Sequence, residues 1–94
     1  MPKPTSVNIL GVDFSVHYVD MSEYGSDGLL GLMEYSKSKI LIDSSQSKQI
    51  QRCTLIHEII EAINVMLELA LEHNVISSLE VSLSQVAKDN KGVF

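Results

Sequence analysis

The segment at residues 54–61, TLIHEIIE, holds the side chains best suited to chemistry. In an α-helix, His57 and Glu61 project from neighbouring turns about 40° apart, so both can reach one ion. Imidazole nitrogen and carboxylate oxygen both ligate zinc. Glu58 projects beside the pair, where a carboxylate can take a proton from zinc-bound water. The spacing therefore predicts a His-Glu-x-x-His type of zinc site in which Glu61 replaces the second histidine.

A polar helix face offers a simpler interpretation of the same residues, because Glu and His opposite an apolar arc are usually just solvated. Cys53 lies one turn before His57 and could share an ion with it. It cannot also share that ion with Glu61, which is about 12 Å further along the axis, and a buried, unreactive Cys53 is the commoner case. His17, on the polar side of an expected strand, is a weaker candidate ligand.

The elements that must position these residues can be read from hydrophobic periodicity. Alternating or short apolar runs predict strands at 7–10, 12–19, 28–35 and 39–43, and 3.6-residue periodicity predicts helices at about 47–69 and 75–89. The expected fold is α+β: a small antiparallel sheet of three to four strands followed by two helices. We expect one domain over residues 1–94, with residues 1–6 as a flexible N-terminal arm.

Composition excludes several classes of function. Seven Lys and Arg against twelve Asp and Glu give a net charge of −5, which argues against nucleic acid as a partner. The longest apolar region, residues 55–71, carries charged side chains that would be costly in lipid, so no membrane span is expected. Cys53 is the single cysteine, and the first residues resemble no signal peptide, so the sequence predicts a cytoplasmic protein.

The order of these features resembles a known family. An Ile-rich strand, ILID at residues 40–43, precedes the helix with LIHEII, and LExxLxQVxxDN closes the second helix. This arrangement, over residues 28–90, is similar to small zincin-like proteins of the ImmA/IrrE type encoded by phages and prophages. The resemblance implies a sheet beside a metal-binding helix, a third zinc ligand from the next helix, and zinc-dependent cleavage of a peptide or protein in the host-cell cytoplasm.

Two residues could supply the third ligand. Glu80 follows Glu61 by nineteen residues, close to the interval of related metallopeptidases, and borders the apolar face of the second helix. His73 is the alternative, but an unbroken first helix would place it about 24 Å from His57, and we expect it to be an exposed loop histidine. Glu80 can reach the zinc site only if the first helix ends near residues 67–71, although neither Gly nor Pro marks the end of a helix there.

With His57, Glu61 and Glu80 as ligands, a fourth zinc position stays open for water, and Glu58 is the predicted catalytic base. Strand 39–43 could pair with an extended substrate if it formed the sheet edge. The alternative function is a catalytically inactive interaction or regulatory module of a phage, favoured by the Glu61 replacement and the short chain. An exposed apolar helix face on so small a domain also suggests a homo-oligomer.

Overall fold

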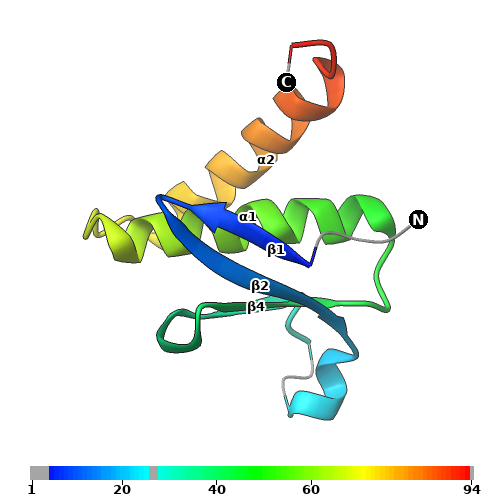
Figure 1. Cartoon of the computed structure of the whole chain (residues 1–94). Helices are drawn as coiled ribbons and strands as arrows, with labels where there is room; N and C mark the ends of the chain where they lie inside the picture. Colours follow the sequence, from blue (N-terminus) through cyan, green and yellow to red (C-terminus); the bar gives the residue numbers. More distant parts are fainter. Residues whose placement is uncertain (1–4, 26–27, 94) are drawn as a thin grey trace.

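The computed structural model describes residues 5–25 and 28–93, and it forms a sheet with two long helices (Figure 1). The elements follow one another as β1 (Ser6–Ile9), β2 (Val12–Val19), η1 (Met21–Tyr24), β3 (Gly31–Glu34), η2 (Tyr35–Lys37), β4 (Lys39–Asp43), α1 (Lys48–Met66) and α2 (His73–Asp89). The α+β prediction is confirmed. Residues 1–4 of the expected arm lie outside the described residues, and Ser6 already belongs to β1.

The sheet is mixed, with strand order β1-β2-β4-β3. Its two outer pairs, β1 with β2 and β3 with β4, are antiparallel as predicted, but β2 and β4 run parallel. The chain crosses from β2 through η1 to the far edge and returns along β4, so β4 enters beside β2 in the same direction. Residues 39–43 therefore do not meet the condition for pairing with a substrate, because β4 is an inner, buried strand and β3 is the edge strand on that side.

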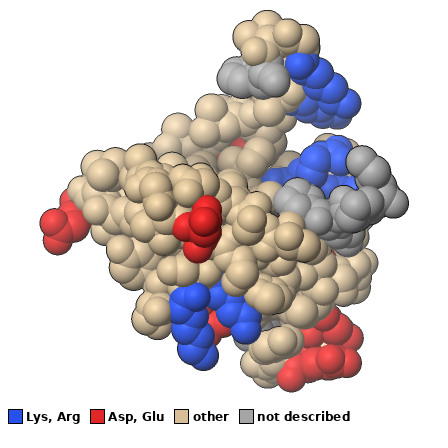
Figure 2. Space-filling view, viewed as in Figure 1, with Lys and Arg blue, Asp and Glu red and all other residues tan. Residues whose placement is uncertain are grey.

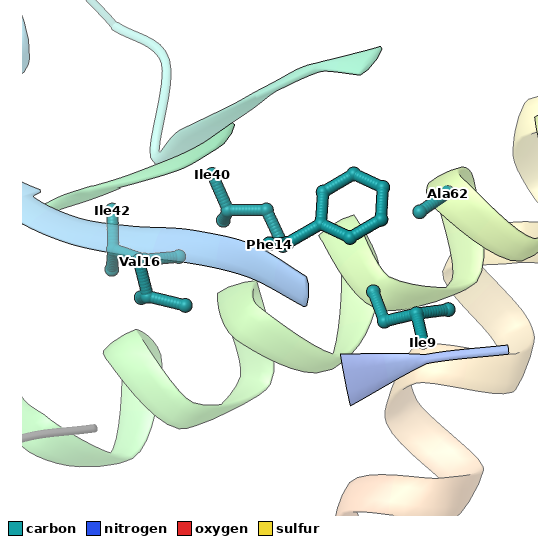
Figure 3. Close-up of a cluster of buried hydrophobic side chains, with 6 residues drawn as sticks. All are labelled: Ile9, Phe14, Val16, Ile40, Ile42 and Ala62. Carbon is teal, nitrogen blue, oxygen red and sulfur yellow. The ribbon is translucent and has the colours of Figure 1, made fainter. Parts of the chain in front are cut away.

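The hydrophobic core lies between the sheet and α1 (Figure 3). Strand side chains alternate between faces, so Phe14 and Val16 of β2 point the same way as Ile40 and Ile42 of β4. All four are at most 5% exposed, and they pack with Ile9 of β1 and Ala62 of α1. Burying each large apolar side chain contributes roughly 1.5–3 kcal/mol, which fixes the helix against the sheet.

The turn between the helices decides where α2 can reach. Helix α1 begins after Ser47, whose hydroxyl accepts the Ile50 N–H at 3.2 Å, and it ends at Met66. The chain then reverses through left-handed conformations at Glu68 and Ala70, with φ of 51° and 56°. The Leu71 N–H donates to Asn64 Oδ1 at 2.9 Å, which ties the turn to the helix end. The first helix thus ends early enough for Glu80 to approach His57.

Helix α2 contacts α1 near its own start and then diverges from it (Figure 1). Only Ile76 of α2 is fully buried. Leu79, Leu83 and Val86 remain 38%, 48% and 36% exposed. Within residues 5–25 and 28–93, no helix combines the length and apolar character needed to cross a membrane.

Candidate functional site

Glu58 points from α1 toward the sheet rather than into solvent. The side chain is only 7% exposed, and Thr54, one turn earlier on the same face, is 6% exposed. The interpretation of the polar helix face as solvated is therefore wrong for Glu58. Burying a carboxylate in a small domain is costly, which marks Glu58 as a candidate for function rather than for stability.

Gly31 of the edge strand allows this close approach. A Cβ atom built on Gly31 would lie 2.5 Å from Thr54 Cγ2 and 3.4 Å from Glu58 Oε2. A contact of 2.5 Å is too short for any real side chain, so a larger residue would push α1 away from β3. The sequence carries a signal for this feature, since a glycine inside a strand often marks close approach of another segment.

Burial raises the pKa of the Glu58 carboxyl to about 7, because water is removed from its charged form. The neighbouring His57 opposes this rise, while the negative charges of Glu61 and Glu80 add to it. In the part of the chain that the structure describes, no hydrogen-bond donor contacts the Glu58 carboxyl to stabilise its charge. A carboxyl with a pKa near 7 can accept and return a proton at neutral pH, as a general base must.

His57 and Glu80 meet across the two helices. His57 Nδ1 lies 2.8 Å from Glu80 Oε1, although the residues are 23 positions apart, and their side chains are 18% and 25% exposed. The contact forms because α1 ends at Met66 and α2 returns along it. Two of the three predicted metal ligands are therefore brought together by the fold.

Glu61 and His73 lie near this pair without completing it. Glu61 follows His57 by one turn and is half-buried, close enough for its charge to act on Glu58. His73 opens α2 rather than lying in a loop, and its ring centroid is 5.6 Å from that of His57. The early end of α1 brings His73 closer than a continuous helix would, so the sequence arithmetic underestimated its proximity.

The donor types fit zinc, since His57 supplies an imidazole nitrogen and Glu61 and Glu80 supply carboxylates. His57 and Glu80 already place their donor atoms side by side. Among the described residues, however, no group of three or more His, Cys, Asp or Glu side chains is gathered closely enough to hold a metal. The His57–Glu80 pair is preformed, and the full set of three ligands stays a prediction.

The other candidate residues lie apart from this pair. Cys53 is a free, half-buried thiol that lines a groove between α1 and α2. His17 Nε2 lies 3.0 Å from Ser15 Oγ on the same strand, and both face away from the side of β2 that packs on α1. We therefore assign neither residue to the site.

Comparison of the chain with protein family models, with curated proteins and with solved structures finds no match in any of the three.

Proposed function

We propose that the protein is a zinc-dependent peptidase, in which His57, Glu61 and Glu80 hold the metal and Glu58 is the general base. The contact between His57 and Glu80 carries this proposal, because it joins two predicted ligands from separate helices at 2.8 Å. The burial of Glu58 beside an edge strand supports it independently. By the resemblance noted above, the protein acts in the cytoplasm of a phage host.

Bound zinc supplies a Lewis acid that acidifies water and polarises the scissile carbonyl. Glu58 accepts the proton of the attacking water and then passes it to the leaving amine, a role suited to its pKa of about 7. The Glu58 carboxyl lies beside β3, whose outer edge pairs with no other strand of the described sheet. Backbone groups on that edge can hydrogen-bond an extended peptide and hold it in line with Glu58.

A catalytically inactive interaction module is the second candidate. One observation favours it, namely that the described residues present no ready-made group of three metal-binding side chains. The two candidates differ in whether the chain cleaves peptides, not in whether His57 and Glu80 are in contact.

Cleavage of fluorescently quenched casein, measured with one equivalent of zinc, tests the proposal. We expect cleavage by the wild-type chain and a loss of at least about a hundredfold in Glu58→Gln, which keeps the side-chain shape but cannot accept the proton. Glu72→Gln is the matched control, because Glu72 is exposed, and should cleave as wild type does. Equal activity of Glu58→Gln and wild type would contradict the role of Glu58, and zinc binding without cleavage would favour the interaction module.

A further inference from the structure

A groove of about 480 Å³ separates the first half of α1 from the second half of α2. Its size falls within the range of ligand pockets in proteins. Apolar atoms of Cys53, Ile56 and Val81 line it, and Arg52 and Lys88 stand on opposite helices around it. The groove lies where α2 diverges from α1, as the course of the two helices shows (Figure 1).

Three cationic side chains surround the groove. Arg52, Lys88 and Lys91 all line it, which places three of the seven Lys and Arg of this acidic chain at one site. Figure 2 shows Lys and Arg side chains on both sides of the gap between the end of α2 and the start of α1. None of the three forms an ion pair within residues 5–25 and 28–93.

Two acidic residues, Glu80 and Asp89, also line the groove, and each has a polar contact. Asp89 Oδ2 accepts a hydrogen bond from Gln85 Nε2 at 2.8 Å, and Glu80 Oε1 contacts His57. A hydrogen bond does not neutralise a carboxylate, so the lining carries three cations against two carboxylates, a net charge of +1 in a protein whose net charge is −5. Such a reversal of local charge favours an anionic ligand.

Glu80 connects the groove to the candidate site, since it lines the groove and also contacts His57. Glu80 stands at the end of the groove that is nearest the turn between the helices, so a peptide lying in the groove would reach Glu80 there. The groove is thus placed to hold one part of a ligand whose other part lies at His57 and Glu58.

We propose that this groove binds an acidic peptide segment, with carboxylates on Arg52, Lys88 and Lys91 and apolar side chains against Ile56 and Val81. The inference deepens the proposed function by naming the substrate class, and it rests on that function only for the cleavage step. A peptide fits better than a nucleic acid, because the described residues that line the groove include three cations and apolar side chains but no aromatic side chain for base stacking.

Fluorescence anisotropy tests the proposal without zinc, using a short fluorescein-labelled peptide of alternating Leu and Glu and a matched peptide with Gln at every Glu. The acidic peptide should bind at least about tenfold more tightly than the Gln peptide. Arg52→Glu and Lys88→Glu should each weaken its binding about tenfold. Lys37→Glu is the control, since Lys37 lies outside the groove and pairs with Glu34, and should bind as wild type does.

Circular dichroism checks that each variant is folded, and loss of wild-type binding at high salt gives a second readout that needs no variant. Equal affinity for the two peptides, or an equal loss in Lys37→Glu, would overturn the proposal. So would tighter binding of single-stranded DNA, or a concentration-dependent dimer that Arg52→Glu abolishes. The assay involves neither zinc nor cleavage, so it tests the groove separately from the proposed function. If the protein binds the acidic peptide but cleaves no substrate, the peptidase proposal is contradicted and the groove proposal is not.

Discussion

At the scale of single residues, the buried carboxyl of Glu58 links stability to pH. Its pKa is about 7 in the folded protein and 4.5 as an ordinary carboxyl, so the folded state binds more protons between these values. This contribution to stability is fully present below pH 4.5 and is lost as the pH rises through 7. The lowered pKa of Asp43, caused mainly by hydrogen bonds from Gln46 and Ser45, acts only at more acidic pH.

We predict that Glu58→Gln removes this dependence and stabilises the metal-free protein at pH 8 by up to about 3 kcal/mol. Urea unfolding at pH 5.5 and pH 8 measures the effect. The free energy of unfolding of the wild type should be lower at pH 8 than at pH 5.5, and this difference should be smaller in Glu58→Gln. Glu72→Gln, at an exposed position, should behave as wild type does. A wild type that gains stability between pH 5.5 and 8 would contradict the account of Glu58.

At the scale of elements, the contact between α1 and β3 depends on Gly31. We predict that Gly31→Ala destabilises the fold by roughly 1–3 kcal/mol, because the added Cβ would overlap Thr54 Cγ2. Thr54→Ser removes that methyl group, so the double variant should recover part of the loss. Thermal unfolding of the two single variants and the double variant measures this coupling. Additive effects would show that Gly31 and Thr54 are not in contact.

The turn between α1 and α2 depends on Asn64. We predict that Asn64→Ala costs about 1 kcal/mol, since it leaves the Leu71 N–H without its side-chain acceptor. Asn90→Ala, which removes an exposed bond to the Val86 carbonyl, should change the free energy of unfolding by less than about 0.5 kcal/mol. Equal effects of the two substitutions in urea unfolding would mean that Asn64 does not hold the turn.

Local periodicity was enough to predict a sheet of three to four strands and both helices, whereas Glu80 was chosen as a partner of His57 by the resemblance to related metallopeptidases. Periodicity could not predict the parallel pairing of β2 and β4, because that pairing depends on a long crossover rather than on neighbouring residues. The burial of Glu58 was also missed, since a helical wheel does not show that Gly31 leaves room for a carboxyl. The side chain of Asn64 holds the turn that follows the first helix, a signal that a search for Gly and Pro overlooks.

At the scale of the whole molecule, a group of carboxylates adjoins a group of cations, and Glu80 belongs to both surroundings. Glu58, Glu61 and Glu80 lie close enough for the latter two to raise the pKa of Glu58, while Arg52, Lys88 and Lys91 line the adjoining groove. Gathering carboxylates without a cation is unfavourable, so a bound zinc ion would relieve repulsion that the folded chain now bears. Zinc binding should therefore raise the stability of the whole domain.

Calorimetric titration of the metal-free chain with zinc is the most direct test of the central claim. We predict one zinc ion per chain, with affinity lowered at least about a hundredfold by His57→Ala and by Glu80→Ala. His73→Ala should bind zinc as wild type does, and so should Glu58→Gln, whose changed group is not a ligand. Absence of zinc binding by the wild type, or unchanged affinity in Glu80→Ala, would contradict the account.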